Sequence, residues 1–290
     1  MTTFKRILFP VDFSDQSRGE VSSVKAMAGR FDAQIVVMHV VDLPSSWFGL
    51  PEAASWSTLI NADQLRASSR VALDLFIKKE FCGTRVAWEL AEGDAAVQIV
   101  DYAQHDPATL IMMPTHGYGP FRELLLGSIT AKVLHDSHSP VWTAVHAKEI
   151  AEHSPEQWKR MLCAVDTDDR DLSVLQWAAE FAFGQQAELK LVHAIPGTNA
   201  AVTEENAPRT YRFLFDVARE QLASMQARAG TKLEVCLLGG QAGDVVRRTA
   251  IEYDTDLILI GRGVMQEAFG RLRTRAYAII REAPCPVISI

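Results

Sequence analysis

An internal repeat limits what this 290-residue chain can fold into more than any other feature of its sequence. Four segments of the first half recur, in the same order, in the second half. The pairs are "RILFPVDFSDQS" (6–17) with "RMLCAVDTDDRD" (160–171), "AQIVVMHVVD" (33–42) with "AELKLVHAIP" (187–196), "TLIMMPTHG" (109–117) with "DLILIGRG" (256–263), and "SPVWTAV" (139–145) with "CPVISI" (285–290). The chain is therefore a tandem duplication, and each copy has the size of one domain.

The join between the copies is predicted in the segment "HAKEIAEHSPEQW" (146–158), which is polar, contains a proline and lacks a regular hydrophobic period. We expect a first domain over residues 1–147, a linker over 148–158 and a second domain over 159–290.

Within each copy, short apolar runs alternate with longer amphipathic ones. The runs of the first copy predict strands near 5–11, 34–41, 84–90, 109–113 and 140–145, and helices near 15–30, 58–81, 94–105 and 128–136. Runs such as "IVVMHVV" and "TLIMM" do not alternate between apolar and polar residues, which is typical of strands covered on both faces. The pattern predicts an α/β fold in which crossover helices flank a parallel sheet.

Composition excludes several classes of protein. A net charge of -7 argues against a general nucleic-acid binder, since such proteins need a basic face for the phosphate backbone. The four cysteines lie far apart, without the spacing of a zinc site or a disulfide framework, which fits a reducing cytoplasm. The first apolar run is too short for a signal peptide, and no segment approaches the ~20 apolar residues that span a bilayer. We expect a cytoplasmic protein without a membrane partner.

The stretch "MPTHGYGPFRELLLGSIT" (113–130) contains the strongest candidate for a binding site. It begins at a strand end, turns at Gly117 and reaches Gly127 directly before a predicted helix. The first N–H groups of a helix are unpaired and carry the positive end of its dipole, so an anion fits there. A purely structural role, with Ser128 as N-cap and Gly127 as a turn residue, explains the same residues equally well on physical grounds.

These landmarks together resemble the universal stress protein domain. Nucleotide-binding members of that family carry Gly, two residues, Gly, nine residues, and then Gly followed by Ser or Thr. The resemblance covers nearly the whole chain as two successive domains. It implies two tandem, doubly wound, Rossmann-like domains, each with a five-stranded parallel sheet in the order 3-2-1-4-5, and an adenine nucleotide held between strands 1 and 4.

The resemblance also implies which residues of the first copy contact ATP. Asp12, Val40 and Val41 would border the adenine, Met113 and Pro114 the ribose, and Gly117, Gly127, Ser128, Ile129 and Thr130 the phosphates, with Mg²⁺ accompanying them. The first copy departs from the motif at Pro114, which stands in place of the first glycine and has no N–H to donate. The alternative for Asp12 is that it only helps Ser14 to begin the first helix.

The second copy departs further from the motif. Asp166, Gly261, Gly263 and Thr274 would form a weak second site, but Arg273 stands at the position of Gly127. An acidic run at the end of the first strand of this copy (Asp166, Asp168, Asp169, Asp171) repels a polyphosphate unless a cation intervenes. Nearby arginines could hold an anion in another way, while a surface charge cluster without a ligand is the simpler interpretation.

Other interpretations of the sequence have less support. No phosphate loop of the GxxxxGK[ST] type, adenylyl-transfer signature or supported Cys/His or Ser/His pair is present, so we assign no catalytic residue and no metal ligand and expect at most a slow ATPase. The repeated His39 and His193 are interpreted as structural. The aromatic segment 45–56 is either a lid or partner surface, or a local cluster packed under its own loop.

Two hypotheses about function follow. The leading one is a stress-response sensor or regulator that binds ATP mainly in the first copy and acts on an unidentified protein partner. The alternative is an interaction or scaffold protein that needs no nucleotide, which Pro114 and the altered second motif favour.

The resemblance also yields a testable prediction about assembly. Single-domain relatives commonly dimerise through the last strand, and "PVWTAV" and "PVISI" are apolar segments expected at sheet edges. We therefore expect the two copies to pair with each other as an intramolecular pseudo-dimer, with homodimerisation of the full chain left open. The second copy expressed alone should expose "PVISI" and self-associate. Light scattering over a range of concentrations would contradict this pairing if that fragment stayed monomeric.

Overall fold

The computed structural model describes residues 4–42, 55–115, 126–144, 158–168, 171–196, 202–203, 205, 207–262 and 274–290. The chain divides into two compact units. The first contains the described residues from Phe4 to Thr115 and from Gly127 to Val141, and the second contains Leu126 and those from Trp142 onward. The exact limits of the domains and linker stay a prediction, because residues 145–157 lie outside the described residues.

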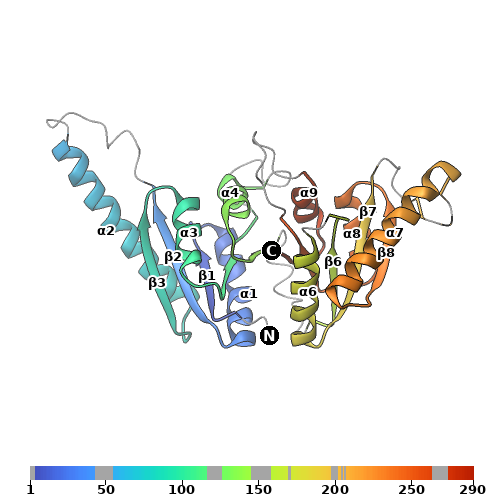
Figure 1. The fold of residues 1–290 in the computed structure, drawn as a ribbon. Coiled ribbons are helices and arrows are strands. Elements are labelled where there is room, and N and C mark those ends of the chain that lie inside the picture. Colours follow the sequence, from blue (N-terminus) through green and yellow to red (C-terminus); the bar gives the residue numbers. More distant parts are fainter. Residues whose placement is uncertain are drawn as a thin grey trace. The chain divides into compact units, whose positions relative to one another are not determined.

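The first unit has the predicted alternation of strands and helices (Figure 1). Its elements are β1 (Arg6–Pro10), α1 (Asp15–Phe31), β2 (Gln34–Val41), α2 (Ser55–Glu80), β3 (Val86–Glu92), α3 (Ala95–Gln104), β4 (Thr109–Met112), α4 (Ser128–Asp136) and β5 (Val141–Thr143), the last of which ends in the second unit. The strand order β3-β2-β1-β4-β5 confirms the expected 3-2-1-4-5 topology.

The second unit repeats this plan. Its elements are β6 (Arg160–Ala164), α6 (Asp171–Gln185), β7 (Glu188–Ile195), α7 (Arg209–Ala229), β8 (Glu234–Gly239), α8 (Ala242–Glu252), β9 (Leu257–Ile260), α9 (Thr274–Glu282) and β10 (Val287–Ser289). The order β8-β7-β6-β9-β10 is the same as in the first unit, so the predicted duplication and α/β fold class are confirmed.

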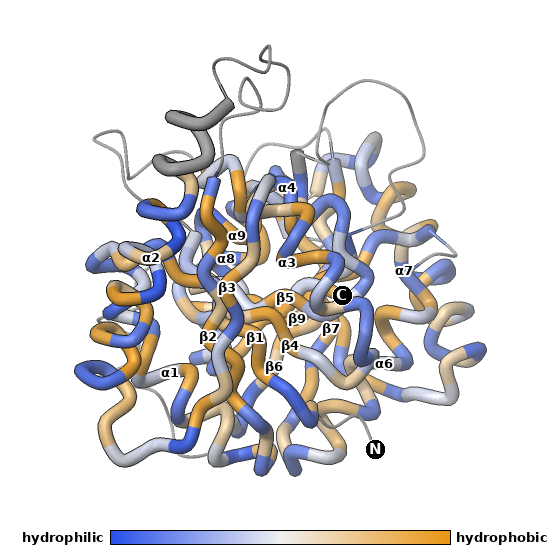
Figure 2. Tube along the Cα trace, turned by 90° about the vertical axis from the view of Figure 1, so that its left-hand side faces the viewer, coloured by the Kyte–Doolittle hydropathy of each residue, from blue (hydrophilic) through white to orange (hydrophobic). Residues whose placement is uncertain are grey.

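The central strand β1 fixes the first unit. It pairs in parallel with β2 on one side and with β4 on the other, and its middle residues are buried. The four residues of β4 are all buried, as the unbroken apolar run predicted. Figure 2 shows the hydrophobic residues concentrated along such central strands. Helices α1 and α2 contact this sheet separately from α3 and α4, which pack on each other.

Local residues explain where the helices begin and end. The Ser14 side chain caps α1 by accepting a hydrogen bond from the Ser17 N–H, and the Asp94 side chain caps α3 in the same way through Val97. Helix α1 ends at Asp32, whose φ of 51° is left-handed. Strand β3 begins two residues later than predicted, because residues 81–84 form a turn in which Gly83 has a φ of 75°.

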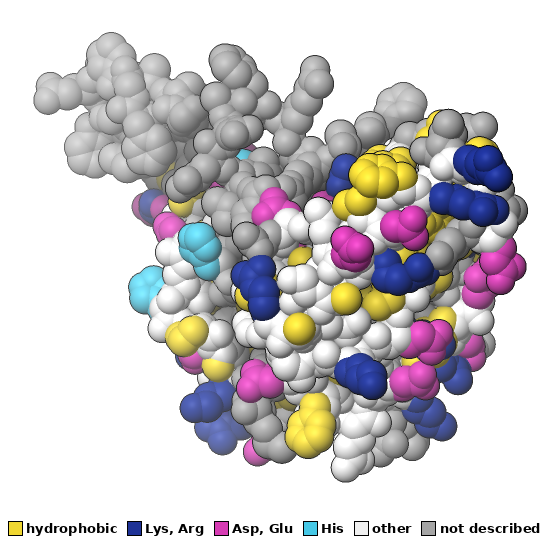
Figure 3. Space-filling model, turned by 45° about the vertical axis from the view of Figure 1, so that its right-hand side comes forward, with side chains coloured by type: hydrophobic (Ala, Val, Ile, Leu, Met, Phe, Trp, Pro, Cys, Tyr) yellow, Lys and Arg dark blue, Asp and Glu magenta, His cyan; other side chains and the backbone are white. Residues whose placement is uncertain are grey.

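The described surface mixes charges of both signs. On the face drawn in Figure 3, the acidic and basic side chains are interspersed rather than gathered into a basic stripe. Among the described residues, no helix has a stretch that is both long and apolar enough to cross a membrane.

The cap of α1 can be tested by mutation. Ser14 is buried and its hydroxyl satisfies one of the unpaired N–H groups of the helix, so Ser14→Ala should lower the free energy of unfolding by about 1 kcal/mol. The same substitution at the exposed Ser68, inside α2, should be neutral or slightly stabilising, because alanine is the better helix former. Urea unfolding followed by circular dichroism compares the two variants. Equal losses would contradict the assigned cap.

Candidate functional site

A cavity of about 270 Å³ opens at the carboxyl ends of β1, β2 and β4. At this point β2 lies on one side of β1 and β4 on the other, so the direction in which strands are added to the sheet reverses. Ligands bind at such points in open α/β sheets. Its lining comes from these strand ends, from α3 and from the start of α4. The lining residues are Pro10, Val11, Asp12, Ser17, Met38, His39, Val40, Ala95, Ile99, Met113, Pro114, Gly127, Ser128, Ile129 and Thr130.

Most of the residues that the sequence predicted for the site lie around this one cavity. They are Asp12, Val40, Met113, Pro114, Gly127, Ser128, Ile129 and Thr130. Val41 does not line it. Val41 is buried instead in a cluster with Ala62 and Leu90. Gly117 lies outside the described residues.

Sequence reasoning missed several walls of the cavity. Met38 lies two residues before Val40 on β2, so strand alternation alone could have identified it. Ala95 and Ile99 lie four residues apart on α3 and therefore share one face of that helix. Nothing in the sequence indicated that this face of α3 would reach the strand ends.

The start of α4 offers a site for an anion. Its N-cap, Gly127, provides no side-chain hydrogen bond to the helix, and Ser128 and Ile129 are exposed at its first turn. The φ of -59° and ψ of 145° at Gly127 are open to any residue, so the backbone conformation does not require glycine there. The missing side chain instead leaves room beside the unpaired N–H groups.

Thr130 has a different partner from the one that the sequence suggested. Its hydroxyl donates a hydrogen bond of 3.0 Å to the carbonyl oxygen of Pro114, and the side chain is buried. The bond ties the first turn of α4 to the end of β4. The single hydroxyl hydrogen of Thr130 is used in this bond, so Ser128 is the more available donor for a ligand.

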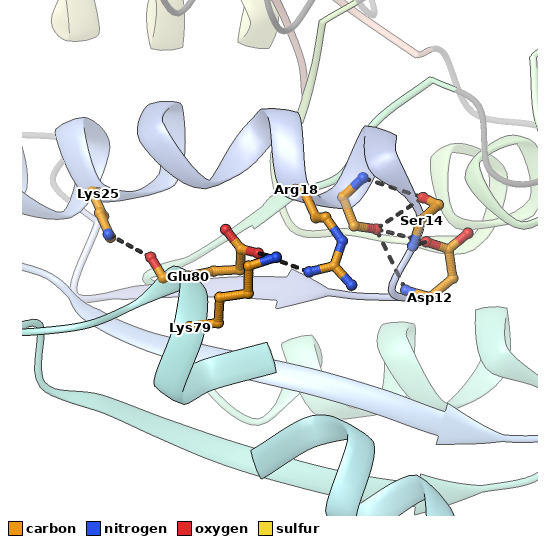
Figure 4. A network of polar contacts seen from close by, with 7 residues as sticks. Asp12, Ser14, Arg18, Lys25, Lys79 and Glu80 are labelled. Atoms are coloured by element: carbon orange, nitrogen blue, oxygen red, sulfur yellow. Dashed lines mark hydrogen bonds and ion pairs between the residues drawn. The ribbon is translucent and has the colours of Figure 1, made fainter. Parts of the chain in front are cut away.

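Asp12 belongs to a small network that joins the end of β1 to α1 (Figure 4). Its Oδ1 accepts hydrogen bonds from the Ser14 N–H at 3.0 Å and from the Ser17 hydroxyl at 2.7 Å. Asp12 thus helps Ser14 to begin α1, which was the alternative role suggested by the sequence. Among the described residues, Oδ2 accepts no hydrogen bond, and Asp12 also lines the cavity. The two roles are compatible.

Phe13 follows Asp12 with a left-handed backbone, at a φ of 62°. This conformation is costly for a bulky residue and persists only where the surroundings hold it. The ring of Phe13 packs 4.4 Å from His39 and 5.7 Å from Phe76, measured between ring centroids. The left-handed conformation of Phe13 turns the backbone so that the Ser14 N–H lies within hydrogen-bonding distance of the Asp12 carboxylate.

A second set of contacts holds α1 against the end of α2. Arg18 forms an ion pair of 2.7 Å with Glu80, and the Lys25 ammonium donates to the Glu80 carbonyl oxygen at 2.6 Å (Figure 4). The guanidinium of Arg18 also lies over the Phe76 ring, 5.3 Å from its centroid. Phe76 thus contacts both Arg18 and the ring of Phe13.

His39 and His193 take equivalent structural positions, as the sequence suggested. Their Nδ1 atoms lie 2.8 and 2.9 Å from the carbonyl oxygens of Val11 and Val165, the residues that follow β1 and β6. A carbonyl only accepts hydrogen bonds, so Nδ1 carries the proton in both rings. Each histidine therefore fixes the strand end from which an aspartate follows.

An ion pair joins α3 and α4, the two helices that contribute residues to the cavity lining. The Lys132 ammonium of α4 donates to the Asp94 carboxylate at 2.8 Å. This contact, together with the Val97 N–H, keeps the pKa of Asp94 below its usual value. Because both side chains are about half exposed, the link orients the helices more than it stabilises the fold.

The second unit has a smaller cavity of about 110 Å³ at the corresponding place. Asp166 and Gly261 line it, together with Asp171 and Arg275. Gly263 lies outside the described residues, and Thr274 begins α9 but its side chain is likewise not described. No group of three or more His, Cys, Asp or Glu side chains in the described part of either unit is placed to hold a metal ion.

Gly261 is explained by packing within the second unit. A Cβ atom at this position would lie 2.8 Å from Val174 Cγ2 and 3.2 Å from Asp171 Oδ1, both on α6. The glycine therefore lets the end of β9 approach α6, and the space beside it is already filled. The first-unit equivalent is Pro114, so the two copies differ in how the helix meets the strand end.

This packing predicts a loss of stability without any ligand. Gly261→Ala should lower the free energy of unfolding by about 1 to 3 kcal/mol, because the branched side chain of Val174 cannot easily move away. Gly184→Ala on α6, where nothing lies within 4 Å, is the matched control and should be neutral or stabilising. Thermal unfolding measured without nucleotide compares them. An unchanged Gly261→Ala variant would mean that the glycine is not needed for packing.

Comparison with known proteins agrees with the resemblance seen in the sequence. The profile of the Universal stress protein family matches residues 3–144 and 157–290. Universal stress protein MJ0531 of Methanocaldococcus jannaschii is 34% identical over 139 residues, which cover 48% of this chain and 80% of that protein. A universal stress protein of Archaeoglobus fulgidus has a similar fold, with a TM-score of 0.62 at 21% identity over 98% of this chain and 95% of that one.

Proposed function

Because this chain belongs to the universal stress protein family, we propose that its first domain binds ATP and that the protein acts as a cytoplasmic stress-response regulator. The observation that carries the proposal is the cavity between the ends of β1 and β4, which leads to the uncapped start of α4. One continuous surface thus offers apolar walls for a base and N–H groups for a phosphate.

The walls of the cavity fit the nucleoside part of the ligand. Met38, Ile99 and Met113 are buried apolar side chains that can contact the faces of a flat base. Asp12 supplies a carboxylate oxygen that accepts a hydrogen bond from an amino or hydroxyl group. A few polar atoms on a mainly apolar lining are typical of small-molecule sites.

The size of the cavity suits only part of a nucleotide, so another part would lie outside it. At about 270 Å³ it lies just below the usual range of ~300 to 1,000 Å³ for small-molecule pockets. We therefore place the base and ribose inside and the phosphates at the open rim, near Gly127 and Ser128. In this arrangement the helix dipole and the exposed Ser128 hydroxyl face the phosphates.

Mg²⁺ would enter with the phosphates rather than occupy a protein cage. Asp12 is the single Asp or Glu among the described lining residues, and Mg²⁺ commonly keeps several waters while binding phosphate oxygens. We propose a binding and sensing role, with ATP turnover slow if it occurs.

A nucleotide-independent interaction protein is the second candidate, and Pro114 favours it. This residue lies in the cavity wall but has no N–H for a ligand, and its carbonyl oxygen already accepts from Thr130. Mass spectrometry of nucleotide released from the purified protein separates the two candidates. Copurified adenine nucleotide supports the first, and its absence together with no binding of added ATP supports the second.

The ATP site makes a quantitative prediction for the intact chain. Isothermal titration calorimetry should give about one strong ATP site per chain, and Gly127→Arg should abolish it by filling the path of the phosphates. Gly29→Arg adds the same charge to the same unit at an exposed helix position with nothing within 4 Å, and it should leave binding unchanged. Two equal sites, or full binding by Gly127→Arg, would contradict the assignment.

A further inference from the structure

The two cavities are built from matching positions of the repeat, so they can be compared residue by residue. Asp12 corresponds to Asp166, Ser17 to Asp171, Pro114 to Gly261 and Ile129 to Arg275, and all eight residues line their cavities. The cavity of the second unit has less than half the volume of the first, about 110 against 270 Å³. The four pairs of positions differ in size and in charge.

The largest change in chemistry is at the second residue of the helix that follows the fourth strand of each unit. In the first unit this residue is Ile129, an apolar side chain that is 45% exposed. In the second unit it is Arg275, whose Nη1 donates to Asp166 Oδ1 at 2.7 Å. The guanidinium therefore joins the start of α9 to the end of β6 across the cavity.

Asp166 and Asp12 thus have different partners. In the first unit the carboxylate accepts hydrogen bonds from the Ser14 N–H and the Ser17 hydroxyl, and no Lys or Arg pairs with it among the described residues. In the second unit an arginine of the same chain donates to the carboxylate. The Asp166 carboxylate thus already accepts a hydrogen bond from an N–H group of the protein, whereas Asp12 is proposed to accept one from the ligand.

Asp171 strengthens the contrast. It is only 6% exposed, and its carboxylate accepts from the Asp166 N–H and lies against Gly261. The second cavity therefore has two carboxylates in its wall where the first has a carboxylate and a hydroxyl. Moving the guanidinium aside would leave both carboxylates facing an incoming polyphosphate, and this repulsion opposes binding.

We propose that Arg275 is a built-in plug of the second domain, and that the residue at position 129 or 275 acts together with Gly127 or Arg273 to determine which domain accepts a nucleotide. The inference rests on the proposed ATP site of the first domain. The ion pair is half exposed, so by itself it adds little to stability. Exclusion comes from the space that the guanidinium occupies and from the two carboxylates of the cavity wall, Asp166, with which it pairs, and Asp171.

The first experiment transfers the plug into the first domain. Ile129→Arg should place a guanidinium next to Asp12 and reduce ATP affinity in calorimetry at least tenfold. Leu75→Arg is the matched control, since it also replaces an exposed aliphatic side chain by arginine, on α2 and away from the cavity. Affinity that is unchanged or increased in Ile129→Arg would overturn the proposal, because the arginine would then tolerate or bind the phosphates.

The second experiment removes the plug from the second domain. The triple variant Arg273→Gly, Arg275→Ile and Asp171→Ser gives these three positions the residues of the first copy, and it should raise the stoichiometry from about one to about two ATP per chain, with a weaker second site. Arg273→Gly alone, which opens the position of Gly127 but keeps the plug, should stay at about one ATP per chain. Thermal unfolding verifies that the triple variant is folded. A folded triple variant that still binds one ATP would overturn the proposal, and so would loss of a site on Arg275→Ile alone.

A third measurement separates this inference from the ATP proposal. Nuclear magnetic resonance of arginine side chains, without nucleotide, should show slowed guanidinium rotation for Arg275 that is lost in Asp166→Asn and gained at residue 129 in Ile129→Arg. If the wild-type chain binds no ATP but these signals behave as expected, the ATP site fails while the plug stands. A freely rotating Arg275 in the wild-type chain overturns the plug itself.

Discussion

The parallel pairing of β1 with β2 and β4 is the constraint on which the rest of the first unit depends. The register brings Pro10 level with Met38 and Leu8 level with Ile111, so three strands end at one edge of the sheet. Beyond this edge the ladder stops, and the backbone turns outward at Asp12 and Pro114. The cavity lies at the point where the strand order reverses, with β2 on one side of β1 and β4 on the other.

The same ladder in the second unit does not produce an equally open cavity. Met161 is level with both Leu189 and Leu257, so the strands of this unit also end together. What differs is the set of side chains just past the strand ends, where Asp171 and Arg275 replace smaller or uncharged groups. The backbone thus determines where a cavity can form, while a few residues determine whether it stays open.

This division explains which features could be predicted from the sequence. The repeat and the unbroken apolar runs are local patterns, and they predicted two domains with crossover helices on a parallel sheet. The sheet order and the residues around the cavity were instead implied by the resemblance to the family, which rests on motifs such as the glycine and serine at the start of α4. The family likeness named Val40 and Val41 as a pair, and in the structure Val40 lines the cavity while Val41 is buried with Ala62.

Other features depend on contacts between segments far apart in the chain. The bond from Thr130 to Pro114 spans 16 residues, and the ion pair of Arg275 with Asp166 spans 109. In both pairs, the sequence around one residue does not indicate which residue it will contact. Gly261 is similar, because the sequence suggested close approach to a ligand while the structure places α6 against it. Pairing in space, rather than residue type, gives these residues their roles.

The charges around the first cavity bear on how the proposed nucleotide site would work. Its described lining includes no Lys or Arg, so the start of α4, with about half a unit of positive charge, is the main attraction for phosphates there. Asp12 adds a negative charge nearby, which a cation bound to the phosphates would offset. A site with so little fixed positive charge binds a polyphosphate through shape and hydrogen bonds more than through net attraction. Its occupancy would then follow the supply of the nucleotide itself, as the proposed sensing role requires.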